Sequence, residues 1–157
     1  PISMHVHDGF SSGETTSVIT AHLLGMYLPS LATPTLQRLL GVRGMMVTGL
    51  VAMALCIVIS AVIGHAFAHY FIGLVLLGLG WNLLFVAGTQ LLTTTYAPSE
   101  RFRAQGCNDL AVFGSQAMAS LLAGTAMETI GWQALNVASL PLLLAVVVLL
   151  FRTPVRS

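Results

Sequence analysis

The sequence predicts an all-α integral membrane protein with five transmembrane helices. Hydrophobic residues make up 56% of its 157 residues and charged residues only 7%, whereas a soluble domain carries about 25% charged residues. Crossing ~30 Å of hydrocarbon takes about 20 mainly apolar residues, and five such segments follow one another, joined by connections too short to hold a soluble domain. The predicted helices are 15–34, 44–64, 69–96, 105–126 and 132–151.

The segment 15–34 is apolar but carries a polar stripe. At about 100° per residue, Thr15, His22, Pro29 and Thr33 share one helix face. Polar groups are costly in hydrocarbon unless they face a bundle interior or an aqueous cavity, so we expect this helix to line a cavity. Because imidazole side chains can carry protons near neutral pH, His22 is a candidate proton carrier. The alternative is a structural hydrogen bond to a neighbouring helix.

Two segments lack such a stripe. The segment 44–64 is apolar all round, and 132–151 has only Asn136 and Ser139 as polar residues beyond its first turn. Helices that are hydrophobic on every side are typical of membrane spans that face lipid. We therefore expect these two helices to support the others from the lipid side.

The segment 69–96 carries amide and hydroxyl groups along one face. The residues on that face are Asn82, Thr89, Thr93 and Tyr96. Trp81 lies beside them, where its indole either stacks on a substrate or fills space between helices. Four glycines in the segment either let helices pack closely or loosen the helix for movement, and the sequence leaves both open. They are Gly73, Gly78, Gly80 and Gly88.

The segment 105–126 carries two stripes. The polar one consists of Gln105, Asp109, Gln116 and Ser120. The other consists of small residues spaced by four, which let helix backbones approach closely, so we expect it to pack against another helix. Its members are Ala111, Ser115, Ala119 and Ala123.

Asp109 is the only acid inside a predicted membrane helix. Because an ionisable group in hydrocarbon is costly, such residues are functional by default, which makes Asp109 a candidate for proton coupling or substrate contact. It also lies near the start of its helix, where the helix dipole and nearby Arg101 or Arg103 could stabilise an ordinary charge. Both interpretations stay open at this point.

The arginines predict the orientation of the chain. The sequence has six arginines and no lysine, and short cytoplasmic loops are enriched in these residues. All six fall in the first and third connections and in the C-terminal tail, which lie on one side if the helices alternate. We therefore expect an outside N-terminus and a cytoplasmic C-terminus. The six are Arg38, Arg43, Arg101, Arg103, Arg152 and Arg156.

The N-terminal stretch MHVHDG places His5, His7 and Asp8 together. A zinc site needs three or four ligands in fixed geometry, and the outer face adds only His65, His69 and Glu128. A membrane metalloenzyme built on these histidines is therefore an alternative, whereas we expect no metal, no cofactor and no enzymatic activity. The net charge of +1 indicates no nucleic-acid partner.

Two stretches resemble a known family. LGLGWNLLFVAGTQLLTTTYAPSERFRAQGCNDLAVFG resembles helices ten and eleven of bacterial major facilitator superfamily transporters, and HLLGMYLPSLATPTLQRLLGVRG resembles their helix eight and the loop after it. The resemblance implies that the five segments are helices eight to twelve of a twelve-helix bundle whose N-terminal half is missing here. It also implies that helices seven, eight, ten and eleven line the central cavity.

One loop departs from the family pattern. The family signature is Gly-x-Leu-x-Asp-Arg-x-Gly, and here Pro34 and Gln37 stand in place of the Gly and the Asp. Arg38 and Gly41 are retained. A gating role for the acid is therefore in doubt at this position.

The resemblance implies secondary active transport of a small solute by alternating access, with proton-coupled efflux as one form, in a bacterial inner membrane. Partners would be the lipid bilayer, a small-molecule substrate and the missing N-terminal half, without which this fragment should not transport. A non-transporting membrane sensor is a further alternative. Uncharged amides and hydroxyls suit a neutral, amphipathic or mildly charged solute. The predicted pathway residues are His22, Trp81, Asn82, Thr89, Thr93, Asp109, Gln116 and Ser120.

Overall fold

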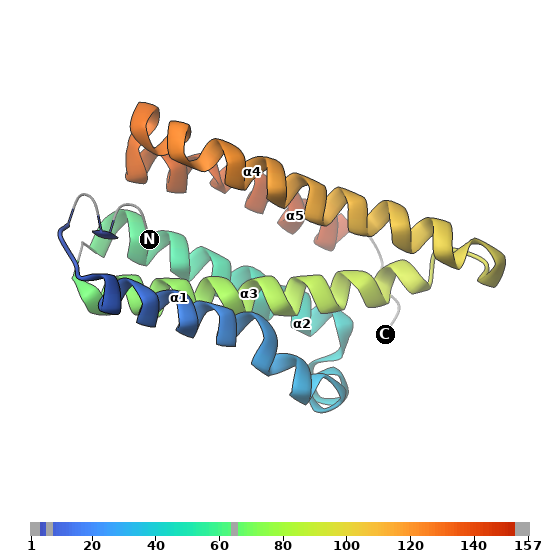
Figure 1. Cartoon of the computed structure of the whole chain (residues 1–157). Coiled ribbons are helices and arrows are strands. Elements are labelled where there is room, and N and C mark those ends of the chain that lie inside the picture. Colours follow the sequence, from blue (N-terminus) through green and yellow to red (C-terminus); the bar gives the residue numbers. More distant parts are fainter. Residues whose placement is uncertain (1–3, 6–7, 64–65, 153–157) are drawn as a thin grey trace.

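The computed structural model describes residues 4–5, 8–63 and 66–152, and this part of the chain contains helices and no strand (Figure 1). The main helices are α1 (Ser12–Tyr27), α2 (Thr33–Val58), α3 (Phe67–Thr93), α4 (Arg101–Ala138) and α5 (Leu140–Arg152). Short helical turns connect them: η2 (Leu28–Ala32), η3 (Ile59–Ile63) and η4 (Pro98–Glu100). The prediction of an all-helical chain is confirmed.

Four helical runs among the described residues are long and apolar enough to cross a membrane. They are Ser12–Ala61, Phe67–Thr93, Pro98–Gly131 and Ala134–Arg152. The first run turns back on itself between α1 and the long part of α2 (Figure 1). It therefore supplies two antiparallel legs, where the sequence pattern places the separate helices 15–34 and 44–64.

Two glycines and one proline set where the legs begin and end. Gly41 interrupts α2 with φ 65° and Gly131 interrupts α4 with φ 75°, a left-handed backbone that glycine adopts without steric cost. Pro29 has no N–H to continue an α-helix, and α1 gives way to η2 after Tyr27. The last leg consequently starts after Gly131 and runs on into α5.

Helix α3 is the centre of the packing, with α1 on one side and α2 on the other (Figure 1). A Cβ added to Gly78 would collide with the carbonyl oxygen of His22 in α1, and one added to Gly80 would lie 2.9 Å from the carbonyl oxygen of Gly49 in α2. A Cβ on Gly88 would meet nothing within 4 Å. Of the two roles left open for these glycines, close packing therefore applies to Gly78 and Gly80.

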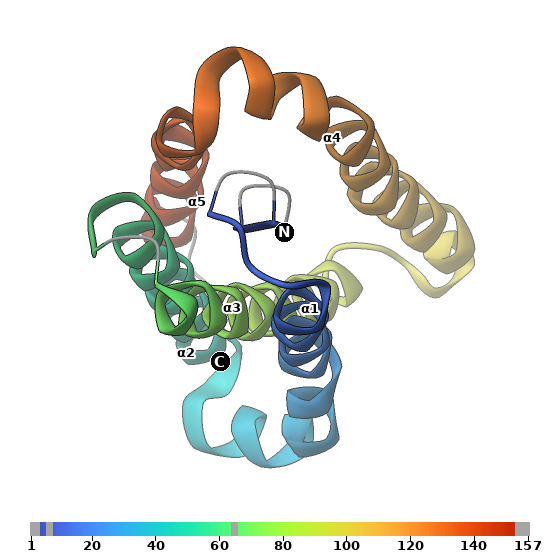
Figure 2. The same ribbon diagram turned by 60° about the vertical axis from the view of Figure 1, so that its left-hand side comes forward.

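The part of α4 that precedes Gly131 packs only sparsely against the rest of the described chain (Figure 2). Only 6% of the apolar window of Pro98–Gly131 is buried, against 39% for α3. The small-residue stripe of α4 is exposed and touches no other helix closely among the described residues, so its close packing stays a prediction for a helix outside this chain. The stripe comprises Ala111, Ser115, Ala119 and Ala123.

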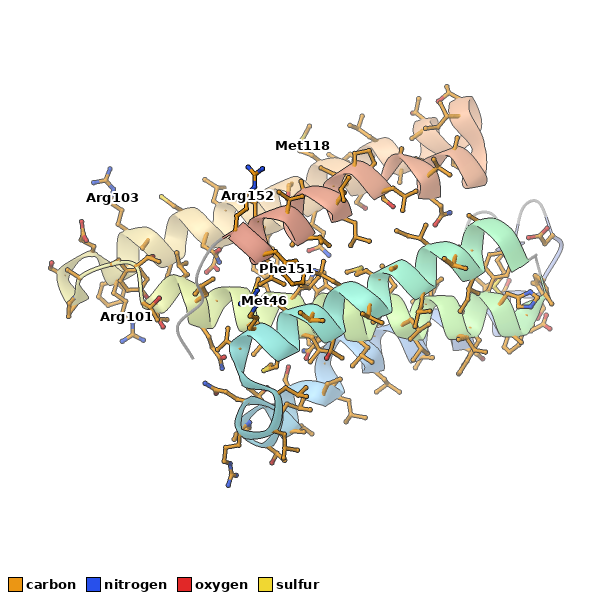
Figure 3. All side chains as sticks on the ribbon, turned by 180° about the vertical axis from the view of Figure 1, so that it is seen from behind. Met46, Arg101, Arg103, Met118, Phe151 and Arg152 are labelled. Carbon is orange, nitrogen blue, oxygen red and sulfur yellow. The ribbon has the colours of Figure 1, made fainter. Side chains whose placement is uncertain are left out.

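The segments that carry the described arginines lie toward one half of the long axis, which we call the arginine end (Figure 1). Figure 3 shows Arg101 and Arg103 near its tip and Arg152 nearer the middle. The turns between α1 and α2 and between α3 and α4 lie there, whereas the N-terminal segment and the α2–α3 turn lie at the other end. The guanidinium carbon of Arg43 lies 5.3 Å from the centre of the Phe151 ring, a cation–π contact that ties α2 to α5. The residues are Arg38, Arg43, Arg101, Arg103 and Arg152; Arg156 lies outside the described residues.

Candidate functional site

The polar faces of α3 and α4 meet at the arginine end. The turn between the two helices is closed by η4, where Glu100 Oε2 accepts a hydrogen bond from the backbone N–H of Ala97 at 3.2 Å. The short turn makes α3 and α4 antiparallel, and side chains rather than closely packed backbones join them. Across it, Gln105 Nε2 donates to the hydroxyl oxygen of Tyr96 at 2.8 Å. This bond joins the two faces that the sequence assigns to one cavity.

A cavity of about 510 Å³ opens at this junction. Its lining residues come from the end of α3, the turn and the start of α4: Thr93, Tyr96, Pro98, Arg101, Phe102 and Gln105. Three of them belong to the predicted polar faces, and Arg101 adds a positive charge. Thr93 itself donates its hydroxyl to the carbonyl oxygen of Gln90 at 2.6 Å. The cavity is therefore a polar mouth between α3 and α4.

Three aromatic rings bridge the same two helices farther along. Trp81 and Phe85 of α3 stack with ring centres 4.8 Å apart and an interplanar angle of 7°. Phe85 in turn meets Phe113 of α4 at 6.0 Å. Phe113 follows Asp109 by one turn and precedes Gln116 by another, so it lies on the polar face of α4. We call these three residues the aromatic ladder.

The sequence reasoning missed Phe85 and Phe113. Both are apolar, so neither stands out in a search for polar residues in apolar segments. Their spacing was the available signal, because Phe85 follows Trp81 by four residues and Phe113 follows Asp109 by four. The polar mouth and the aromatic ladder together form what we call the α3–α4 seam.

Asp109 lies on the seam side of α4 and is exposed. Its Oδ1 accepts a hydrogen bond from Asn108 Nδ2 at 3.3 Å. Within the described part of the chain it forms no ion pair with Arg101 or Arg103. Gln116 and Ser120 are exposed on the same face. The proton-coupling role of Asp109 stays a prediction.

Thr89 lies on α3 between the ladder and the polar mouth. Its side chain is half-buried, one turn beyond Phe85 in the direction of Thr93. All the predicted pathway residues of α3 except Asn82 therefore lie along the seam, with Trp81 at one end and Thr93 at the other.

His22 and Asn82 lie instead between α1 and α3. His22 Nδ1 is 2.8 Å from the carbonyl oxygen of Leu74, and because a carbonyl only accepts, Nδ1 carries the proton and Nε2 is left as an acceptor. Asn82 is 3% exposed, and its Nδ2 donates at 2.6 Å to the carbonyl oxygen of Met26 and at 2.6 Å to Ser30 Oγ. Both side chains hold α1 against α3, and their roles in a solute pathway stay predictions.

The loop that resembles the family signature is held by hydrogen bonds. Gln90 Nε2 of α3 donates to Gln37 Oε1 at 3.1 Å, so the residue that replaces the family's acid contacts α3. Arg38 Nε donates to the carbonyl oxygen of Pro34 in its own helix at 3.3 Å. Gly41, with its positive φ, ends the first part of α2, which begins at Thr33. The loop therefore keeps its shape without an ion pair in the described part of the chain.

The N-terminal segment, whose histidines are the basis of the metalloenzyme alternative, is hydrogen-bonded to α3. The Tyr70 hydroxyl donates to Asp8 Oδ2 at 2.5 Å, and His5 Nδ1 lies 2.8 Å from the carbonyl oxygen of Phe10. In the described ranges, no three His, Cys, Asp or Glu side chains are placed to share a metal ion. His7 and His65 lie outside those ranges.

A second cavity, of about 410 Å³, lies between α2, α3 and the last leg. Most of its wall is apolar, including Leu50, Leu74 and Val146, with Ser60 and Asn136 among the few polar residues. A solute site needs convergent polar groups that fix orientation. The α3–α4 seam provides more of them, and we therefore take the seam as the candidate site.

Comparison with known proteins identifies the family. The sequence profile of the Major Facilitator Superfamily matches residues 1–157. The chain is 36% identical over 148 residues to the riboflavin transporter RfnT of Brucella anthropi, an alignment that covers 94% of this chain and 37% of that protein. No solved structure matches the chain.

Two proteins of Bacillus subtilis strain 168 are also similar. The uncharacterized MFS-type transporter YdeG is 34% identical over 137 residues, covering 87% of this chain and 32% of that protein. The uncharacterized MFS-type transporter YddS is 32% identical over 146 residues, covering 91% and 34%. The chain thus spans about a third of the length of the curated relatives it matches.

These similarities agree with the apolar helices described above. The predicted family and the prediction of apolar membrane helices are confirmed, and the names of the relatives point to transport rather than to an enzyme. With its full length matched by one family, the chain belongs to the Major Facilitator Superfamily.

Proposed function

We propose that this chain forms helices eight to twelve of a secondary active transporter that moves a small solute by alternating access. In such transporters the site lies near the bilayer midplane between discontinuous or polar helices, and one half of the protein rocks against the other. The observation that carries the proposal is the α3–α4 seam. It places Tyr96, Gln105 and Phe113 on facing helices in a chain whose family is known.

The arginine end is the cytoplasmic end. Short cytoplasmic loops are rich in Arg and Lys, and the described arginines gather toward that end. The N-terminal segment with Asp8 and the start of α3, where Tyr70 binds Asp8, then lie outside, in the periplasm if the membrane is a bacterial inner membrane. The polar mouth lined by Thr93 and Arg101 opens to the cytoplasm.

Asp109 couples transport to protons. It is an exposed carboxylate on the seam side of α4 with no arginine partner among the described residues, so it can exchange a proton through the polar mouth. His22 Nε2 is a second proton acceptor on the α1 side of α3. Proton binding at Asp109 then favours one of the two conformations.

Riboflavin is the first solute to test. The relative RfnT is named as a riboflavin transporter, and the seam offers neutral amides, hydroxyls and aromatic rings rather than clustered charges. Residues outside this chain also supply part of the site, so related neutral solutes belong in the same screen.

The test uses the full-length protein that contains this chain, reconstituted in liposomes with an imposed proton gradient. We expect saturable riboflavin movement that stops when an uncoupler dissipates the gradient. Residues 1–157 reconstituted alone serve as the control and should move nothing. Solute binding without movement by the full-length protein would indicate a membrane sensor and overturn the proposal.

A further inference from the structure

The aromatic ladder lies at the depth where a transporter binds its solute. Trp81 is next to the central residue of α3 (Phe67–Thr93), and Phe113 lies near the middle of the part of α4 that precedes Gly131. Solute sites in secondary transporters lie near the bilayer midplane. The ladder and the expected site therefore occupy the same level along the membrane normal.

The ladder is not buried as a packing core would be. Phe113 is 49% exposed, and Trp81 is only partly buried although it stacks on Phe85. In contrast, the residues that hold α2 to α3, such as Met45 and Ala87, are 0% exposed. The ladder therefore keeps accessible ring surface in the described part of the chain, mainly on Phe113.

Polar side chains of α4 lie at the level of Trp81. Phe85 pairs with Phe113 across antiparallel helices, so four residues farther from the arginine end Trp81 comes level with Ala117. Gln116 and Ser120 flank that position on the seam side of α4. An amide and a hydroxyl on the seam side of α4 therefore lie at the same depth as the indole, and both are exposed.

We infer that the seam binds a planar, conjugated heterocycle, whose ring face stacks on Trp81 and Phe113 and whose polar edge hydrogen-bonds to Gln116 and Ser120. This inference rests on the proposed transport function, because it assumes that solute reaches the seam. Aromatic side chains prefer offset-stacked or edge-to-face contact with other rings. Uncharged hydrogen-bonding groups beside them select a heterocycle with carbonyl and N–H groups over a hydrocarbon ring.

The experiment measures binding to the full-length protein in nanodiscs by equilibrium dialysis. The probes are carbostyril, a planar bicyclic lactam, and its decahydro derivative, which keeps the amide edge but has no ring face. We expect carbostyril to bind at least about tenfold more tightly, since stacking of one planar base on an aromatic side chain contributes about 1–3 kcal/mol. Equal affinity for the two probes would overturn the inference.

Variants assign the effect to the ladder. Trp81→Leu and Phe113→Leu should each weaken carbostyril binding about tenfold, whereas Trp81→Phe should stay within about threefold because it keeps a ring face. Phe71→Leu changes an exposed ring of α3 outside the seam and should have no effect. If Trp81→Leu binds carbostyril like the unchanged protein while eluting as a folded species, the rings are helix packing and the inference fails.

Gln116→Leu provides a variant that leaves all three rings in place. It should lower carbostyril affinity and leave the affinity for naphthalene, which has no polar edge, unchanged. An equal loss for both probes would contradict the assigned role of Gln116. Transport assays on the same preparations separate the two proposals. Movement of non-planar solutes with no preference for planar rings would contradict this inference alone. Stacking-dependent binding without movement of any solute would contradict the transport function alone.

Discussion

Replacing Gly78 with alanine should separate α1 from α3. The new methyl would lie 3.0 Å from the backbone nitrogen of Met26 and 3.1 Å from the carbonyl carbon of Gly25, and it would collide with the carbonyl oxygen of His22. All of these are backbone atoms, so the clash is not relieved by rotating a side chain. Moving the helices apart also weakens the bonds that His22 and Asn82 make across the same interface.

The magnitude follows from three contributions. Overpacking typically costs about 1–3 kcal/mol. Losing three interhelical hydrogen bonds at about 0.6 kcal/mol each costs about 2 kcal/mol more. Replacing glycine with alanine in a helix returns about 1 kcal/mol. We therefore expect Gly78→Ala to lower the free energy of unfolding by about 3 kcal/mol.

Gly88→Ala is the matched control, because it lies in the same helix with nothing within 4 Å of the added methyl. It should be neutral or stabilise by up to about 1 kcal/mol. Both variants would be unfolded by SDS titration of the full-length protein in mixed micelles, followed by circular dichroism. If Gly78→Ala proves as stable as Gly88→Ala, the close approach of α1 and α3 is wrong.

Asp109→Asn should abolish gradient-driven flux yet keep solute exchange down a gradient; an unchanged pH profile would make Asp109 an ordinary helix-end charge. Asn82→Leu should lower the free energy of unfolding of the full-length protein by about 1–2 kcal/mol in the same SDS titration, because the buried carbonyl of Met26 loses its hydrogen-bond donor. An unchanged free energy of unfolding would show that the amide is dispensable. Arg43→Gln should cost about 0.5–1 kcal/mol through the lost Phe151 contact, and Phe151→Leu should cost the same, since each removes one partner of the pair.

The sequence pattern was sufficient for the class of fold because it depends on the average polarity of long segments. The structure consists of helices, and four of its helical runs are long and apolar enough to cross a membrane, as the composition predicts. A membrane helix has to satisfy its backbone internally whatever its neighbours are. For that reason, membrane helices can be predicted from composition alone.

The details of the site depend on neighbours, which periodicity does not identify. Asn82 and Thr89 share a helix face within the tolerance of a helical wheel, yet Asn82 bonds to α1 and Thr89 lies along the seam. Gly78 and Gly88 are both glycines within one apolar segment, so the sequence does not distinguish their roles. They differ in the structure because backbone atoms of α1 lie close to Gly78, whereas nothing lies within 4 Å of a Cβ placed on Gly88. Phe113 was overlooked because a phenylalanine in a membrane helix becomes notable only once Phe85 is known to face it.

Because α4 has few contacts before Gly131, a small tilt of this helix would move residues far from its attachment point by several ångströms. Its firm contact near the arginine end is the bond between Gln105 and Tyr96, and Gly131 is a joint at the other end. At about 1.5 Å per residue, Ser120 lies roughly 22 Å from Gln105 and Phe113 roughly 12 Å. A tilt of about 10° would then shift Ser120 by about 4 Å and Phe113 by about 2 Å. A small rotation of one helix would thus widen the space beside Trp81 while barely disturbing the polar mouth, so release of a stacked ring and opening toward the outside would be one motion.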